Sequence, residues 1–574
     1  QTLGGSCNSG HCRISGGTAS GSNLFHRLSK LRTNSNIDKI TLDNLIPGSK
    51  SETFRSIILS NIGRNGTYIN TPFKLDKSSS DLIILSPEGI EIGSLGRFKN
   101  VDTVALSTAE NLTIGGETFH YQNSKQADLI NMKAVLNLAQ SAFSHNQAEA
   151  GQISIKVGDL LSIDGDLLLH SVGGIDIDQA SANSKGNVKI GGGLSLRTYG
   201  KVKDPNAPTD SVLIRNVQID ANNLNVDAKG SIDQPLAVFI EEASIRAKNN
   251  ININGSGGNE SSSINNKYLI GTEILNSSVK STKGDILIRG IGGTGNKKIS
   301  SGDYDFDDGT GIIIEGSNID AKKSLIKLKG TGSFGSKINF GHGIEIANSA
   351  LTANKIRARG LSSKASQSGE IKNSSGINIF NSKLTAREKI DFIGKAANTN
   401  PKKANIITSK GVDIGGSELF TSAGQISIDG TGGSGKSLEL GSGVEISKTS
   451  LRASSIKIAG TGGKTSKLEN SNTSIGIDIL TDSTLDTNSN NDDLGSIYIS
   501  DQIQEQNGDI ELVGVGGTGL EYSGGVFSTA KIDSAGSILI KGQGGSGKKD
   551  IYGVALEATE TDVDNGDLTA RHQI

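Results

Sequence analysis

Residues 430–437, GTGGSGKS, match the phosphate-binding pattern G-x-x-x-x-G-K-[ST], in which backbone amides and a lysine hold nucleotide phosphates. That chemistry also needs a helix directly after the loop, with its N-terminus towards the phosphates. Here residues 438–443, LELGSG, run straight into another β-like stretch, and similar loops occur at 290–297 and 542–549. We interpret the motif as a repeat turn and expect neither nucleotide binding nor a nucleotide cofactor.

An acidic loop at 303–309, DYDFDDG, is a second candidate site, with Asp303, Asp305 and Asp307 at alternate positions. Such carboxylates can converge on one hard cation. An EF-hand would place its glycine one residue earlier and add a distal Glu, and neither holds here. A solvated loop is the simpler interpretation, and a weak Ca²⁺ site is the alternative. We expect no other cofactor.

The two cysteines, Cys7 and Cys12, lie close together with His11 between them. In an exported chain this spacing indicates a small structural disulfide loop. A metal site of these three residues would lack a second ligand cluster to complete a tetrahedron, and free thiols are the remaining alternative. The seven histidines lie in unrelated contexts, and no Asp, Arg or Lys set at one-repeat spacing singles itself out. We therefore expect no catalytic residues and no enzyme.

The composition limits the kind of fold and the kinds of partner that this chain can have. Glycine supplies 76 of 574 residues, proline only 7, and Trp is absent, which favours tight turns and small repeated cores over one large centre. Lys and Arg (58) balance Asp and Glu (60) without long runs of one sign, so a nucleic-acid partner is not expected. No apolar run is long enough to span a membrane. The chain begins at Gln1 without an apolar leader, and we expect a processed, exported protein.

Repeats dominate the second half of the chain. The unit is Gly-apolar-x-apolar, then a Ser-x-apolar step, then x-apolar-x-apolar-x-Gly-x-Gly-Gly. Regular copies follow one another at intervals of 32 to 35 residues and begin at Gly311, Gly343, Gly376, Gly411, Gly443 and Gly476. Less regular copies begin at Gly271, Gly525 and Gly553.

Within each unit, apolar and polar residues alternate over short stretches, which is typical of strands with one buried face. Three short strands cannot close a core alone but can when stacked on the next unit. We therefore predict an all-β fold, a right-handed parallel β-helix. Its expected parts are a secretion-type domain at 1–195, less regular coils at 196–270 and regular coils with polar edge loops at 271–574. Residues 126–143 fit a helical period, and we expect one short helix or capping insertion there.

Three stretches near the N-terminus resemble the secretion domain of two-partner-secretion exoproteins, the filamentous-haemagglutinin family. Residues 21–28, GSNLFHRL, resemble the family's G-x-N-L-F-H-S-F segment and include Asn23, Leu24, Phe25 and His26. Residues 61–66 are similar to its N-I-x-x-R-V-x-G step. Residues 81–93 resemble D-L-x-L-x-N-P-N-G-I-x-x-G, with the departure that both family amides are replaced. The residues at that step are Ser86, Pro87, Glu88, Gly89 and Ile90.

The resemblance implies a mechanism and a location. An outer-membrane β-barrel partner would recognise the N-terminal domain in the periplasm, and the unfolded chain would pass outward through the barrel. The protein would be secreted to the extracellular surface of a Gram-negative bacterium and fold there coil by coil.

Three functions are compatible with these observations. The first is a rod-like surface adhesin or matrix component that binds glycans or proteins of a host or a neighbouring cell. The second is a filament subunit that associates end to end. The third is a β-helix enzyme acting on polysaccharides. Since the last repeat, from Gly553, is shorter than the others and no cap follows it, we expect either a fragment of a longer chain or an end covered by a neighbour.

Overall fold

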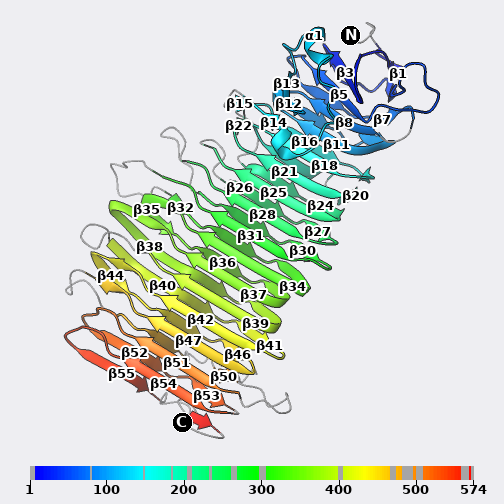
Figure 1. Cartoon of the computed structure of the whole chain (residues 1–574). Coiled ribbons are helices and arrows are strands. Elements are labelled where there is room, and N and C mark those ends of the chain that lie inside the picture. The colour runs from blue at the N-terminus through cyan, green and yellow to red at the C-terminus, as the bar shows by residue number, and fades with distance from the viewer. Residues whose placement is uncertain are drawn as a thin grey trace. The chain divides into compact units, whose positions relative to one another are not determined.

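The computed structural model describes residues 7–77, 80–145, 149–181, 185–202, 210–231, 236–259, 268–295, 306–397, 405–465, 473–480, 496–498, 508–534, 536–557 and 568–570. By compactness the chain divides into two units, Gln1–Gly255 and Ser256–Ile574. The domain limits expected after residues 195 and 270 stay predictions. Figure 1 colours the first unit blue to green and the second green to red.

The first unit is built from short strands stacked mostly in parallel. One sheet contains β2 (Thr18–Ser20), β3 (Asn23–Leu28), β5 (Ser56–Asn61), β8 (Ser80–Leu85), β11 (Val101–Ser107), β17 (Leu161–Ile163), β18 (Leu167–Ser171), β20 (Gly186–Ile190), β21 (Gly193–Thr198), β24 (Val217–Ala221), β25 (Asn223–Lys229), β27 (Ser244–Ala247) and β28 (Ile251–Ser256). A second contains β6 (Thr67–Ile69), β9 (Ile90–Ile92), β16 (Ile153–Val157), β19 (Ile175–Gln179), β23 (Asp210–Arg215) and β26 (Leu236–Glu241). Two smaller groups are β1 (Gly10–Ile14), β4 (Ile37–Leu42), β7 (Pro72–Leu75) and β10 (Arg97–Lys99), and the pair β15 (Glu149–Ala150) and β22 (Lys201–Val202).

A cap of different structure packs on the first coils. It contains the antiparallel strands β12 (Asn111–Ile114), β13 (Glu117–His120) and β14 (Phe143–Ser144), the helix α1 (Gln126–Leu129) and a 3₁₀ turn, η1 (Gln140–Ala142). The short helix or capping insertion predicted within 126–143 is therefore present, and its helix covers four residues. The carbonyls of Met132 and Ala134 accept hydrogen bonds from the Asn23 side chain instead of from amides further along a helix.

The second unit consists of the predicted coils. One sheet contains β30 (Ser278–Ser281), β31 (Ile286–Ile291), β34 (Asn318–Thr331), β37 (Ala350–Leu361), β39 (Lys383–Lys395), β41 (Glu418–Thr421), β42 (Gln425–Thr431), β46 (Ser450–Arg452), β47 (Ser455–Thr461), β50 (Ser496–Tyr498), β51 (Ile510–Val515), β53 (Lys531–Ser534), β54 (Ile538–Gln543) and β56 (Leu568–Ala570). The other contains β29 (Thr272–Leu275), β32 (Phe306–Asp308), β33 (Ile312–Glu315), β35 (Phe334–Phe340), β36 (Ile344–Ala347), β38 (Lys364–Phe380), β40 (Asn405–Gly415), β44 (Ser437–Leu440), β45 (Val444–Ser447), β49 (Ile477–Leu480), β52 (Tyr522–Ser528) and β55 (Asp550–Leu556). A short pair is β43 (Ser434–Gly435) and β48 (Lys464–Thr465).

Successive coils of the second unit pair in parallel and in register. Ile344 lies beside Ile377, and Ile377 beside Val412, and all three side chains are buried. Each coil thus adds one apolar layer to a continuous interior, and each fully buried aliphatic side chain contributes about 1.5–3 kcal/mol. The predicted all-β fold, a parallel β-helix, is confirmed.

Two columns of glycine line the corner where the two sheets of the second unit meet. Gly360 of β37 lies against Gly376 of β38, so closely that a Cβ atom at Gly360 would overlap the Gly376 carbonyl oxygen. The same approach recurs from coil to coil. The members of the first column are Gly290, Gly330, Gly360, Gly394, Gly430, Gly460, Gly514 and Gly542. The repeated glycines of the sequence are therefore required by close backbone approach.

The Ser-x-apolar step of each repeat forms a buried hydroxyl ladder. The Ser317 amide donates to the Ser349 hydroxyl at 3.0 Å, and the Ser349 amide donates to the Ser382 hydroxyl at 3.1 Å. Each hydroxyl in turn donates to a backbone carbonyl, as Ser349 does to Ala347 at 2.7 Å. The residue before the hydroxyl is left-handed, with φ of 49° at Asn348. Equivalent bonds begin at Ser277, Ser382 and Ser417 and end at Thr449.

Candidate functional site

Asn23 of the first motif stretch fastens the cap to the first coil. Its side chain is buried, and Nδ2 donates to the carbonyls of Met132 and Ala134, each at 2.9 Å. These partners lie more than a hundred residues further along the chain. The first coil is therefore complete only when the cap has been added.

The next motif residues form the interior beneath the cap. Leu24, Phe25 and His26 are all buried, and the Phe25 ring lies 5.2 Å from the Phe119 ring, between centroids. Burial lowers the pKa of His26 to about 4, so its imidazole is neutral at physiological pH. Phe25, His26 and Phe119 also line a cleft of about 580 Å³.

The third motif stretch forms a tight turn. The Gly89 amide donates to the Ser86 carbonyl at 2.9 Å, and the Ser86 hydroxyl donates to the Gly89 carbonyl at 2.9 Å. Gly89 has a φ of 114°, which favours glycine. Pro87 is buried, Glu88 is exposed, and Ile90 begins β9. The turn thus forms without the two amides of the family pattern.

The remaining candidates from the sequence are the two cysteines, the acidic loop and the phosphate-binding pattern. Cys7 and Cys12 form a disulfide with an S–S distance of 2.01 Å. Asp303 and Asp305 lie outside the described residues, as does the side chain of Asp307. In the phosphate-binding pattern, Gly430 belongs to the glycine column, and the short strands β43 and β44 follow it where a nucleotide site needs a helix.

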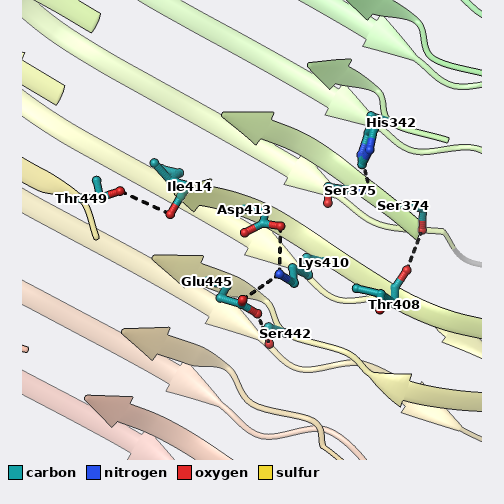
Figure 2. A network of polar contacts seen from close by, with 10 residues as sticks. All are labelled: His342, Ser374, Ser375, Thr408, Lys410, Asp413, Ile414, Ser442, Glu445 and Thr449. Atoms are coloured by element: carbon teal, nitrogen blue, oxygen red, sulfur yellow. Dashed lines mark hydrogen bonds and ion pairs between the residues drawn. The ribbon is translucent and has the colours of Figure 1, made fainter. Parts of the chain in front are cut away.

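A buried charge network that the sequence did not suggest crosses the second unit (Figure 2). The Lys410 ammonium lies 2.9 Å from Oδ2 of Asp413 and 2.7 Å from Oε1 of Glu445. Only 11% of the Lys410 side chain and 12% of the Glu445 side chain are exposed. Burial alone would lower the Lys410 pKa, but the two carboxylates outweigh it and raise the pKa. Lys410 is therefore a buried cation shared between two coils.

The network continues on the coils to either side. His342 is buried, and its Nδ1 accepts the Ser375 amide at 3.1 Å, so the neutral ring carries its proton on Nε2. That atom lies 4.0 Å from Oε2 of Glu345. On the other side, Asp478 is 6% exposed. Burial, with added repulsion from Glu445, raises the Asp478 pKa to about 7.

Coil register brings these residues together. Position x of the Gly-apolar-x-apolar step, between the two apolar residues, pairs with position x of the next coil. This pairing aligns Glu345, Asn378, Asp413, Glu445 and Asp478. The residue before each repeat glycine supplies His342, Ser375, Lys410 and Ser442. The signal was present in the sequence as polar residues at fixed positions within the repeat.

The network is suited to holding coils together rather than to catalysis. Its central groups are paired with one another and largely shielded from solvent. Among the described residues, no three His, Cys, Asp or Glu side chains are placed to share a metal ion. In the same ranges, no helix is long and apolar enough to cross a membrane.

Replacing Asp478 with Asn should make stability less sensitive to pH. Because the folded state holds the Asp478 proton up to about pH 7 and the unfolded chain releases it near pH 4, the contribution of Asp478 to wild-type stability falls as pH rises between these values. Asp478→Asn removes that loss. The free energy of unfolding of the variant, relative to that of the wild type, should therefore be a few kcal/mol higher at pH 8 than at pH 4. Urea denaturation at both pH values measures this. The exposed Asp429 gives the control, and an equal response of Asp429→Asn would contradict the assignment.

Comparisons with known proteins give little further information. No protein family matches the chain, and no curated protein matches it. A solved structure described as "Crystal structure of filamentous hemagglutinin secretion domain" is similar at 10% sequence identity, with a TM-score of 0.24, over 62% of this chain and 94% of that chain. A similarity of this size carries no conclusion about activity or partners.

Proposed function

We propose that the chain is a secreted β-helical exoprotein that acts at the cell surface as an adhesin or matrix component. In this proposal a partner outer-membrane barrel exports it in an unfolded state, and it folds outside. The export step rests on the motif resemblance of the first coils. The surface role rests on a fold that offers parallel sheets with solvent-facing sides.

The observation that carries the proposal is how the motif stretches lie together. The first stretch lies on β3. The second stretch starts at the last residue of β5, and the third stretch starts within β8. These strands are direct neighbours, with Leu24 beside Ile57 and Ile57 beside Leu82. Motifs that are separate in sequence thus form one continuous piece of the first coils, which would fold first once outside.

Three residues of the first motif stretch are buried in the folded protein, so a partner could read these three only before folding. Asn23, Leu24 and Phe25 are each at most 4% exposed. This agrees with recognition of an unfolded segment, because none of the three offers a surface once the cap has closed. Burial then makes return through the barrel unfavourable, since unfolding would expose the apolar layer again.

Export of an Asn23→Ala variant tests the proposal. In a Gram-negative strain that produces the barrel partner, we expect normal synthesis and strong retention of the variant inside the cell, scored by immunoblotting of cells and medium. Leu136→Ala is the matched control, because Leu136 is a buried residue of the same cap outside the motifs. This control should still be exported.

Two results would contradict the proposal. Normal export of Asn23→Ala would show that the motif is not read. Equal retention of both variants would show that export depends on cap stability and not on the motif residue.

A filament subunit that associates end to end is the second candidate. Strand β55 has partly exposed apolar side chains, with Ile551 50% and Val554 40% exposed. An exposed apolar layer on a strand favours association with another chain. Electron microscopy of the cell surface separates single molecules from fibres.

A further inference from the structure

The coil register of the second unit gathers basic side chains on one sheet. Strands β31, β34, β37 and β39 lie side by side (Figure 1), and their residues pair in register. Alternate residues face inward, as Ile326 and Leu328 do, so the residues between them face solvent. We call the basic residues on this outer side the basic face: Arg289, Lys327, Lys329, Lys355, Arg357, Arg359, Lys389 and Lys395.

Acidic side chains neutralise only part of the basic face. Asp391 accepts a hydrogen bond from Arg359 at 2.9 Å and lies 3.7 Å from Lys389. Lys355 pairs with Glu388 at 2.8 Å. The ion pairs between described residues of these strands do not include Arg289, Lys327 or Lys329. These three are exposed and lie on the first two of the four strands.

Stacking like charges has a cost. Neighbouring coils are about 4.8 Å apart, so Lys327 lies directly beside Arg357, and Lys329 beside both Arg289 and Arg359. Like charges directly opposite one another on a sheet are destabilising. A ligand with negative charges at a similar spacing would relieve this repulsion and release the counterions held there.

We propose that the basic face binds a linear anionic polysaccharide that carries sulfate or carboxylate groups. The face is the solvent-facing side of a sheet, and its charges repeat with the coil, a distance close to the length of one sugar unit. The outward positions of the four strands carry no aromatic side chain on which a nucleobase could stack. This favours a polymer recognised by its regularly spaced charges over a nucleic acid.

The proposal names a ligand for the adhesin role and in that respect rests on the proposed function. Binding by the purified chain, however, does not involve export. A failure of binding therefore leaves the export experiment unaffected, and a failure of export leaves binding testable.

Binding of dextran sulfate and polygalacturonate to the purified full-length chain tests the proposal. Lys327→Gln/Lys329→Gln removes two exposed charges and should lower affinity for both polymers about tenfold, with a shallower dependence on salt. The matched control is Lys541→Gln/Lys548→Gln, which makes the same change in net charge at exposed positions of the same unit. This control should bind nearly as wild type, and neutral dextran should not bind.

Three results would overturn the assignment. Equal loss in both double variants would mean that net charge, not the basic face, attracts the polymer. Binding of neutral dextran would exclude charge as the basis of recognition. Tighter binding of duplex DNA than of either polysaccharide would assign the face to nucleic acid instead.

Discussion

Replacing Gly360 with Ala is expected to prevent the coils of the second unit from folding normally. The added Cβ atom would overlap the backbone carbonyl of Gly376, and a backbone atom cannot move aside as the end of a side chain can. Gly360 is also held in register between Gly330 and Gly394 on the coils to either side. The expected loss exceeds about 4 kcal/mol, which is exceptional for one methyl group. Circular dichroism and urea denaturation of the full chain measure it.

Gly415→Ala is the matched control for Gly360→Ala. A Cβ atom at Gly415 would meet only side-chain atoms, the nearest being Cδ2 of Phe380 at 3.3 Å. Since the Phe380 ring is 52% exposed, it can shift, and this variant should keep near wild-type stability. Equal stability of the two alanine variants would show that the glycine column is not required by close approach.

Replacing Lys410 with Met should cost about 3–5 kcal/mol, because it leaves Asp413 and Glu445 buried without their cation. Burial raises the pKa of Glu445, so the loss should shrink as pH falls and that carboxyl becomes protonated. The comparison is Lys383→Met, which breaks an exposed pair with Glu418 at 2.7 Å and should cost at most about 1 kcal/mol. Urea denaturation at pH 5 and pH 8 distinguishes the two. An equal loss of stability in both variants would contradict the prediction that burial of the Lys410 pairs makes their loss more costly.

The strands and their stacking could be predicted from the sequence because each repeat carries the full pattern of a coil. Alternating residues such as Ile344, Glu345 and Ile346 identify a strand, and the constant interval identifies its neighbour. The Ser-x-apolar step was visible too, although its role was not. That a Ser hydroxyl accepts an amide from the preceding coil follows only from the left-handed residue before it, such as Asn348.

The charge network and the basic face could not be found from composition. Net charge averages over the chain, whereas coil register places Lys327 beside Arg357 and Asp413 beside Glu445. An alignment of the repeats with one another, in which equivalent positions are compared, would have indicated both the charge network and the basic face. The close approach of the glycine columns depends on how the two sheets meet at the corner, and no short-range sequence pattern contains that information.

The cap at the N-terminus shows a different limit. Its hairpin was signalled by Gly115 and Gly116, a two-residue loop between short apolar stretches, and both glycines have positive φ in the structure. The helical pattern at 126–143 predicted one short helix or capping insertion, and the structure contains a cap whose helix is limited to Gln126–Leu129. Leu129, Met132 and Leu136 are buried against the first coils, and this tertiary contact outweighs helical periodicity.

The hydroxyl ladder has a consequence for how such a chain can change in length over generations. Each rung needs only a left-handed residue followed by Ser or Thr, and it makes the same bonds whichever coil comes next. Excising residues 317–348 would join Gly316 to Ser349, a left-handed residue followed by a hydroxyl, and would remove one coil in register. Unequal recombination between repeats would therefore add or delete whole coils without requiring compensating mutations at the joint.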